Sequence, residues 1–482
     1  MNHINILIVF SIYTILLFLV GWLTSRKANN NSFFIGEKKS PWYIVAYGMI
    51  SASLSGVTFI SIPGVVGTEG FSYMVIVFGY LIGYFVIARI LIPIYYSFNV
   101  TSIYSYLNIR FGMLSYKAGA SFFLLSRIIG ASFRMFLVIN ILQIFVFNQM
   151  GVPFWVTVIG FVGLILAYTY QGGIKTIVWT DTLQTTFMLL AVGISIFLIS
   201  KESGLSVLDL YKTIDAEGLT KMFVTNTKDS SHYLKQFFSG VFIAIVMTGL
   251  DQDMMQKNLS CRNKKDAQKN IISLSWALVP VNFIFLSLGG FLFYFAQTNG
   301  IQINGTSDML FPTIALNHLG VAAGTIFIIG LIAAAYSSAD SALTSLTTSF
   351  SIDLLGIERR DNLNESEKIK TRKLVHLLMA LVLVLVIATY ELINDQAIIT
   401  KLFTIAGYTY GPLLGLFSFG LISKRKIKDK YAPYIALAAP TLAYLIKLWA
   451  YNSYQYEIGF ELLIYNGLLM YLGLLMISNK NK

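Results

Sequence analysis

Residues 331–351, LIAAAYSSADSALTSLTTSFS, combine many hydroxyl side chains with one carboxylate inside a long apolar run. Hydroxyl residues share one face of a helix at positions 337, 341, 344, 345 and 348. Asp340 lies beside that face, and a carboxylate in a lipid-spanning helix is a functional candidate because its burial is costly. Hard cations take oxygen ligands. We therefore interpret Ser337, Asp340 and Ser341 as one wall of a cation site.

An earlier segment, residues 51–63 with the sequence SASLSGVTFISIP, has the same small and hydroxyl-rich character. Gly56 and Pro63 interrupt its helix, so that carbonyl oxygens near Ser51 and Leu54 become available as further ligands. The alternative is that these Ser and Thr residues only let helices pack closely. The carboxylate of the later segment favours the cation site, because packing alone gives no reason for a charge.

The composition indicates an all-α polytopic membrane protein, since 56% of the 482 residues are hydrophobic and only 12% are charged. The net charge is +12, but the basic residues occur in short clusters between apolar runs, which argues against nucleic-acid binding. A single cysteine, Cys261, excludes an internal disulfide, and the four histidines lack metal-ligand spacing.

Thirteen apolar runs of about membrane length are expected to span the bilayer. Positive charge follows the first run instead of preceding it, which predicts a retained helix and not a signal peptide. The runs are 4–24, 42–66, 72–98, 118–147, 153–170, 174–200, 237–255, 271–297, 321–355, 374–392, 398–422, 432–451 and 460–477.

The distribution of Lys and Arg predicts the orientation of these spans. With the C-terminus in the cytoplasm, 25 of the 35 basic residues lie in inner segments, Lys257 among them, and the short outer connections carry none. We therefore expect the N-terminus outside and the C-terminus inside the cell (inner) membrane.

Two interrupted spans occupy corresponding places in two five-helix halves. Gly56 and Pro63 interrupt the first, and Gly249 followed by Asp251-Gln252-Asp253 interrupts the sixth. Such a pair indicates an inverted-repeat transporter with its binding site near the membrane midplane. The alternative is that glycine and proline are simply more frequent in membrane helices.

Three further charged residues lie within or beside spans. Asp181 is either another ion ligand or an interfacial carboxylate. Arg127 and Arg134 are seven residues apart on one helix face, where a guanidinium clamps a substrate carboxylate or joins an internal ion pair, for example with Asp251 or Asp253. We favour the ion pair for Arg134 and leave both interpretations open for Arg127.

Five ordered motifs carry a resemblance that runs over most of the chain. They are NSFFIGEKKSPWYIVAYGMISASLSGVTFISIPG, TSIYSYLNIRFG, QGGIKTIVWTD, DQDMMQKNLSCRNKKDAQKN and LIAAAYSSADSALTSLTTSFSIDLLG. In these motifs the chain resembles the sodium:solute symporter family. The resemblance implies a LeuT-type fold in a single transmembrane domain, residues 1–482. It comprises a leading helix (4–24), two inverted repeats (42–200 and 237–422) and two trailing helices (432–477).

The resemblance also implies where sodium binds. The main site falls on the backbone carbonyls of Ser51 and Leu54 and on the side chains of Ser337 and Ser341. A second site found in some members falls on Asp181, next to Asp340 and Ser341. Asp340 stands where members usually have Ser or Ala, which leaves the ion number and the choice between Na⁺ and H⁺ open.

For the solute, the resemblance implies a central cavity with Ser53, Ser55 and Thr58 as candidates. Arg127 is expected where the bacterial sialic acid transporters of this family place the arginine that holds the substrate carboxylate. Gly79 replaces a glutamine of that subgroup. The expected solute is a sialic acid or another sugar acid, with neutral sugars and amino acids as rivals.

The resulting function is sodium-coupled symport of a small organic solute by alternating access. Na⁺ is the coupling ion, and neither another cofactor nor enzymatic chemistry is expected. The expected partners are the solute, Na⁺ and the lipid bilayer, with the protein as a monomer. Three alternatives stay open, namely a proton-coupled symporter of the same fold, a solute sensor without useful flux, and a passive channel.

Overall fold

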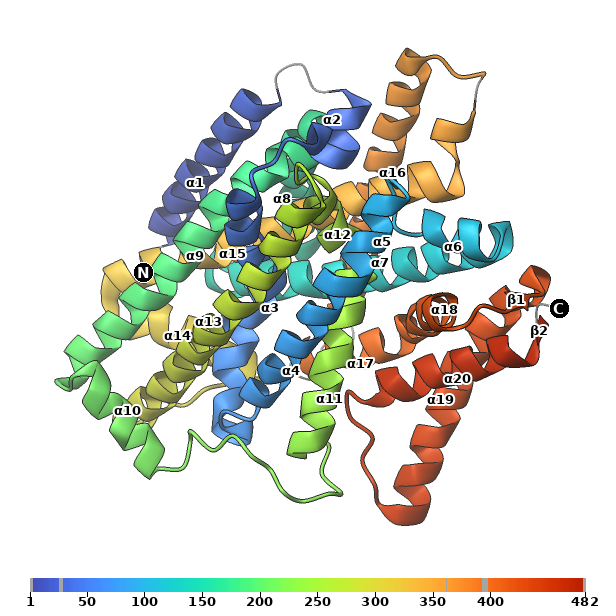
Figure 1. The fold of residues 1–482 in the computed structure, drawn as a ribbon. Coiled ribbons are helices and arrows are strands. Elements are labelled where there is room, and N and C mark those ends of the chain that lie inside the picture. Colours follow the sequence, from blue (N-terminus) through green and yellow to red (C-terminus); the bar gives the residue numbers. More distant parts are fainter. Residues whose placement is uncertain (1–2, 26–28, 361, 392–397, 480–482) are drawn as a thin grey trace.

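A computed structural model describes residues 3–25, 29–360, 362–391 and 398–479. Within these ranges the chain is almost entirely helical (Figure 1). Two strands of two residues each, β1 (Lys426–Ile427) and β2 (Ser478–Asn479), pair antiparallel near the end of the chain. The predicted all-α class is therefore confirmed.

The first half of the chain runs from α1 to α10. Its helices are α1 (His3–Thr24), α2 (Asn30–Ile35), α3 (Trp42–Glu69), α4 (Tyr73–Val86), α5 (Ile92–Ser97), α6 (Ser105–Arg110), α7 (Met113–Leu142), α8 (Phe154–Gly172), α9 (Ile174–Ser203) and α10 (Val207–Ala216). A π-helical turn, η2 (Ile87–Leu91), joins α4 to α5.

The second half runs from α11 to α20. Its helices are α11 (Tyr233–Ala244), α12 (Gln252–Leu259), α13 (Lys264–Thr298), α14 (Leu310–Asn317), α15 (Gly320–Ser349), α16 (Glu365–Tyr390), α17 (Ile398–Thr409), α18 (Gly411–Ile422), α19 (Ala432–Tyr454) and α20 (Leu462–Met476). The π-helical turn η5 (Ile245–Gly249) extends α11.

Helices suited to a membrane dominate the part of the chain that is described. Nine are long and apolar enough to cross a bilayer, two bent pairs pass the same test together, and residues 154–170 and 462–476 form shorter apolar helices. The protein is thus a multi-pass membrane protein. The count of thirteen spans and the boundaries of the two repeats stay predictions.

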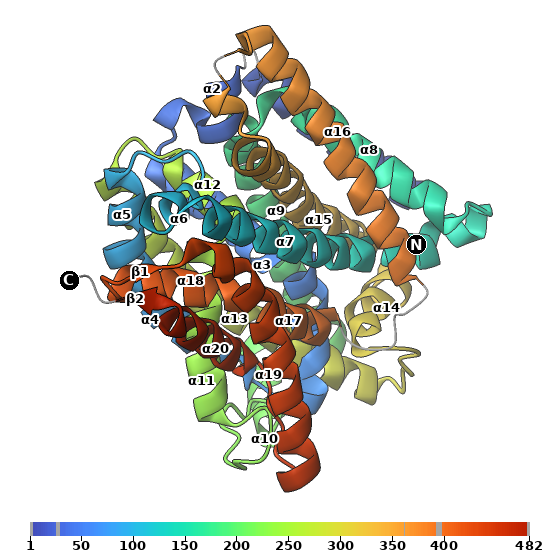
Figure 2. The ribbon, with the colours of Figure 1, turned by 90° about the vertical axis from the view of Figure 1, so that its right-hand side faces the viewer.

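The helix α15 lies at the centre of the molecule (Figure 2). It packs against α9, α3, α7 and α1, and every residue from Gly330 to Ser349 is buried. Small side chains make this possible, since a Cβ added at Gly330 would lie 2.5 Å from Cβ of Ala191 on α9. The hydroxyl-rich segment therefore faces neighbouring helices and not lipid.

Each of the two predicted spans contains a break, but Pro63 lies inside the continuous part of α3 and does not interrupt it. The helix α3 breaks at Ser55, whose φ of 58° and ψ of 175° are not helical. The break thus falls one residue before Gly56, which serves instead to admit α7, because a Cβ there would lie 2.8 Å from Cγ2 of Val138. The second break separates η5 from α12, with a bend of 62°.

A third bend, of 44°, separates α17 from α18. Pro412 lies in the first turn of α18, where its missing N–H costs no helical hydrogen bond. The bend falls at Tyr410 and was not predicted as a break.

The two ends of the helix bundle differ. In Figure 1, α2 lies at one end, and α10 with the loop that follows it lies at the other. The predicted orientation of these ends is untested, and four of its basic residues, Arg26, Lys27, Lys480 and Lys482, lie outside the described residues.

Candidate functional site

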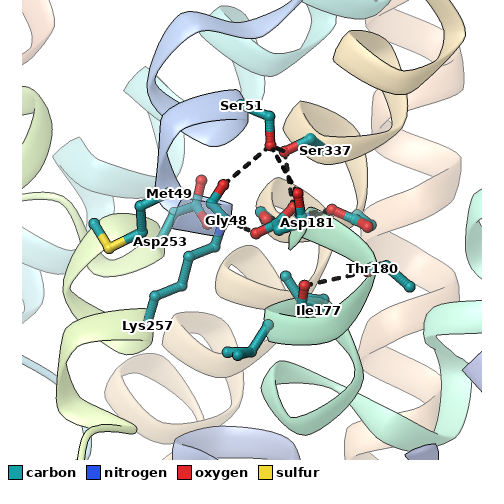
Figure 3. Close-up of polar contacts among 12 residues, drawn as sticks. Gly48, Met49, Ser51, Ile177, Thr180, Asp181, Asp253, Lys257 and Ser337 are labelled. Atoms are coloured by element: carbon teal, nitrogen blue, oxygen red, sulfur yellow. Dashed lines mark hydrogen bonds and ion pairs between the residues drawn. The ribbon is translucent and has the colours of Figure 1, made fainter. Parts of the chain in front are cut away.

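The two hydroxyl-rich segments meet directly, at Ser51 of α3 and Ser337 of α15 (Figure 3). Their hydroxyl oxygens are 2.8 Å apart, and Ser337 donates a 2.7 Å hydrogen bond to Oδ1 of Asp181 on α9. Gly48 allows this approach, because a Cβ there would lie 2.9 Å from Cβ of Asp181. The structure thus brings Ser51, Ser337 and Asp181 together in one buried cluster.

Asp181 is 1% exposed, so its carboxylate is enclosed by protein and does not lie on a solvent-exposed surface. Its second carboxylate oxygen, Oδ2, lies 2.7 Å from Nζ of Lys257 on α12, and both side chains are 1% exposed. The sequence analysis had counted Lys257 among the residues of an inner connection. That placement is corrected, because all eight residues of α12 are buried.

The burial of Lys257 was missed because QDMMQKNL is a polar sequence, which suggested that the span had ended. The short helix α12 is enclosed by α2, α3, α9, α13 and α15, and tertiary packing thus overrides its low hydrophobicity. The available signal was the four-residue spacing from Asp253 to Lys257, which places the two charges on one helix face.

Asp340 lies on α15 in a separate set of contacts. Tyr168 of α8 donates a 2.8 Å hydrogen bond to its Oδ2. The backbone N–H and the hydroxyl of Ser341 donate to Oδ1, over 2.6 Å and 3.2 Å. No Lys or Arg of the described ranges lies within 4.0 Å of this carboxylate.

The break in α3 falls at Ser55, after the two residues whose carbonyl groups are predicted ligands, Ser51 and Leu54. A helix that ends at Ser55 leaves the carbonyls of its last turn without partners further along the helix. These oxygens belong to the same turn as the Ser51 hydroxyl. The predicted combination of hydroxyl, carboxylate and carbonyl ligands stays a prediction.

A cavity adjoins the break in α3, and all four predicted solute residues line it. Ser53, Ser55, Thr58 and Arg127 contribute to its wall, together with Tyr73, Tyr80, Tyr84, Arg134, Thr248 and Asn282. Gly79 is not among the lining residues. It packs against α11, where a Cβ would lie 2.2 Å from the carbonyl oxygen of Phe237, so a longer side chain would separate the two helices.

Arg127 forms the internal ion pair that the sequence had left open. Its Nη2 contacts Oδ2 of Asp253, and its Nη1 lies 3.7 Å from Oδ2 of Asp251. Asp251 also caps α12 by accepting a 2.8 Å hydrogen bond from the backbone N–H of Asp253. Arg127 therefore holds the second broken helix at its break.

Arg134 behaves differently, and the ion pair expected for it does not form with any described residue. Its side chain is buried and lines the cavity, and its Nε has no hydrogen-bond partner. The physical reason is that Arg127, two turns earlier on α7, already takes both Asp251 and Asp253. Among the described residues, no carboxylate thus lies within 4.0 Å of this guanidinium in the cavity wall.

Comparison with known proteins identifies this arrangement. A model of the sodium:solute symporter family matches residues 33–429, so the chain belongs to that family. It is a transporter and not an enzyme, and it performs sodium-coupled symport of a small solute.

Relatives within the family transport different solutes. The sodium/sialic acid symporter SiaT of Proteus mirabilis is 24% identical over 88% of this chain and 86% of its own length. The sodium/sialic acid symporter NanT of Aliivibrio fischeri is 24% identical over 84% of this chain and 80% of its own. The human sodium/iodide cotransporter is also 24% identical, over 83% of this chain and 62% of its own.

Solved structures establish the fold class. A substrate-bound, outward-open Na⁺-coupled sialic acid symporter superposes with a TM-score of 0.84 at 20% identity, and the match covers 99% of both chains. The nucleobase-cation symporter Mhp1 superposes with a TM-score of 0.57 at 14% identity over 93% of both chains. The fold is therefore of the predicted LeuT type.

Proposed function

We propose that this symporter takes up an anionic solute with a carboxylate group, and that Arg134 binds that carboxylate. The observation that carries the proposal is the buried guanidinium of Arg134, which lines the cavity and has no carboxylate within 4.0 Å in the described part of the chain. A buried charge is costly unless it is paired. An anionic solute would supply the missing partner in a bidentate contact.

The remaining wall of the cavity suits a solute with several hydroxyl groups. Ser53, Ser55 and Thr58 offer hydroxyls beside the break in α3, and Asn282 offers an amide. Such groups donate and accept hydrogen bonds without adding charge. Together with the two sialic acid symporters among the relatives, they support a sugar acid as the solute class.

The cavity must widen to admit such a solute. Its volume is about 70 Å³, whereas ligand pockets typically measure about 300–1,000 Å³. The bend in α3 and the bend between η5 and α12 border this cavity. The bend between α17 and α18 lies beside Arg127 and Arg134. Movement at these bends would open the cavity to one side of the membrane at a time.

Sodium is proposed to bind between α3 and α15, on the carbonyls of Ser51 and Leu54 and the hydroxyls of Ser337 and Ser341. The contact of Ser51 with Ser337 supports this location. An ion there would hold the two helices together beside the solute cavity. By linkage, the ion and the solute would then raise each other's affinity by the same factor.

A proton-coupled variant is the second candidate, and Asp340 is the observation that favours it. This buried carboxylate has hydroxyl and N–H donors but no basic partner within 4.0 Å in the described part of the chain. Na⁺ would balance the charge of this carboxylate, whereas a proton would neutralise it.

The experiment that tests the proposal is thermal stabilisation of the purified protein by Na⁺ and by a panel of acidic and neutral sugars. Ligand binding to the folded state raises its stability. An acidic sugar that stabilises only in the presence of Na⁺, and not in Arg134→Gln, supports the proposal. Equal stabilisation of Arg134→Gln would exclude the carboxylate contact.

Orientation and assembly are also proposals. The excess of basic residues in inner segments supports an outer N-terminus and a cytoplasmic C-terminus in the inner membrane. A monomer is the expected assembly state.

A further inference from the structure

Lys257 places a buried ammonium group at the position where a second sodium ion was expected. The group lies 2.7 Å from Oδ2 of Asp181, and neither side chain is more than 1% exposed. In Figure 3 the side chain of Lys257 extends from α12 toward Asp181. An ammonium and a sodium ion carry the same charge, so both are counter-ions for this carboxylate.

The two oxygens of Asp181 have different partners. Oδ1 accepts the hydroxyl of Ser337, which belongs to the proposed main sodium site, and Oδ2 meets the ammonium. Lys257 thus occupies the side of the carboxylate that faces away from Ser337. A sodium ion could take that side only if the lysine side chain left it.

The charges of the cluster support this assignment. Asp181 and Asp340 interact electrostatically and bring two negative charges, whereas Lys257 brings one positive charge. Asp253, also on α12, is already paired with Arg127. With Lys257 in place, Asp181 already has a counter-charge, so Asp340 is the carboxylate left for one mobile cation.

We propose that Lys257 is a tethered cation that replaces a mobile sodium ion at Asp181. The ammonium and Na⁺ are alternative partners of that carboxylate, and with Lys257 in place the cluster binds one mobile cation. This inference rests on the proposed sodium coupling. It assigns the stoichiometry that the sequence left open.

The position of Lys257 also links the ion cluster to the solute cavity. Lys257 lies on α12 one turn after Asp253, and Asp253 is bound to Arg127 at the wall of the cavity. Because α12 is only eight residues long, its movement carries both charges together. Displacement of the ammonium from Asp181 would therefore accompany any rotation of α12 at the 62° bend.

The test measures how steeply thermal stability of the full-length protein depends on Na⁺, with choline replacing Na⁺ at constant ionic strength. Wild type should give a Hill coefficient of about 1. Lys257→Met exposes Asp181 to a second ion, so the coefficient should rise toward about 2 and half-saturation should fall by about tenfold. Lys257→Arg keeps the positive charge and should keep the wild-type slope.

The double variant Asp181→Asn with Lys257→Met removes both charges of the pair and leaves neither partner unpaired, so it keeps the test valid if Lys257→Met fails to fold. We expect it to bind Na⁺ with the wild-type slope, because Asp181 holds no sodium ion while Lys257 is in place. The inference would be overturned if wild type gave a Hill coefficient of about 2 and the double variant lowered it to about 1. An unchanged slope in a folded Lys257→Met protein would also overturn it.

These outcomes are distinct from failure of the proposed function. If Na⁺ stabilises neither wild type nor any variant, sodium coupling itself is wrong. If Na⁺ stabilises wild type and the Lys257 variants follow the wild-type curve, only the tethered-cation role is wrong and the ion pair is structural.

Discussion

The hydroxyl of Tyr410 donates a hydrogen bond to Oδ2 of Asp251, and each residue lies at the bend of a different broken helix. The same carboxylate oxygen lies 3.7 Å from Nη1 of Arg127. The bends of α11–α12 and α17–α18 are thus joined to α7 through one buried polar cluster. We expect a change at either bend to reach the wall of the solute cavity through this cluster.

Removal of Arg127 should destabilise the protein strongly. Arg127→Met leaves Asp253 and Asp251 buried without their cation, and loss of one partner of a buried ion pair costs about 3–5 kcal/mol. The free energy of unfolding, or the melting temperature in one detergent, measures this loss. The double variant Arg127→Met with Asp253→Asn should recover much of it, and no recovery would mean that Arg127 acts mainly through Asp251 or through packing.

Removal of Arg134 should affect solute binding and leave stability nearly unchanged. Because its guanidinium has no counter-ion in the described structure, Arg134→Gln should leave stability unchanged or slightly raised while it abolishes the response to an acidic solute. The melting temperature with and without solute separates the two effects. A large loss of stability in Arg134→Gln would reveal a partner for this residue.

Replacement of Asp340 should distinguish Na⁺ from H⁺ as the coupling ion. Asp340→Asn keeps the size of the side chain and removes the charge that attracts the mobile cation. We expect at least about a tenfold rise in the Na⁺ concentration for half-maximal stabilisation, about 1.4 kcal/mol. Tyr168→Phe is the matched control, since it removes the hydrogen bond to Asp340 and keeps the charge. Stabilisation that follows pH through Asp340 and ignores Na⁺ would favour proton coupling.

Close packing at the centre of the bundle should make Gly330 sensitive to a single methyl group. In Gly330→Ala the added carbon would lie 2.5 Å from Cβ of Ala191 and 2.7 Å from Cζ of Phe59. Overpacking of this kind costs about 1–3 kcal/mol. Gly160→Ala on α8 is the control, because nothing lies within 4 Å of its added carbon and its stability should not fall.

Much of the fold follows from the sequence because membrane helices are encoded by composition and length. The long apolar runs and the interruptions near Gly56 and Asp251 are visible as local patterns. The bend at Tyr410 was missed, because Pro412 in the first turn of a helix is compatible with both a bent and a continuous span.

The site was harder to predict, because the roles of its charged residues depend on distant partners. Arg127 and Arg134 share one helix face, and sequence spacing cannot decide which of them meets Asp253. The burial of Lys257 likewise depends on the five helices that enclose α12. By contrast, Ser51 and Ser337 meet as expected, because each lies in a segment whose polar residues have no reason to face lipid. Asp181 was expected beside Asp340 and Ser341, but its hydrogen bond is with Ser337.

The most direct test of the account is uptake of a radiolabelled sugar acid into proteoliposomes that contain the purified protein. We predict that uptake exceeds equilibrium under an inward Na⁺ gradient, collapses when choline replaces Na⁺, and is absent in Arg134→Gln with the protein still folded. Uptake that only equilibrates, or that follows a proton gradient with Na⁺ absent, would contradict sodium-coupled symport by this site.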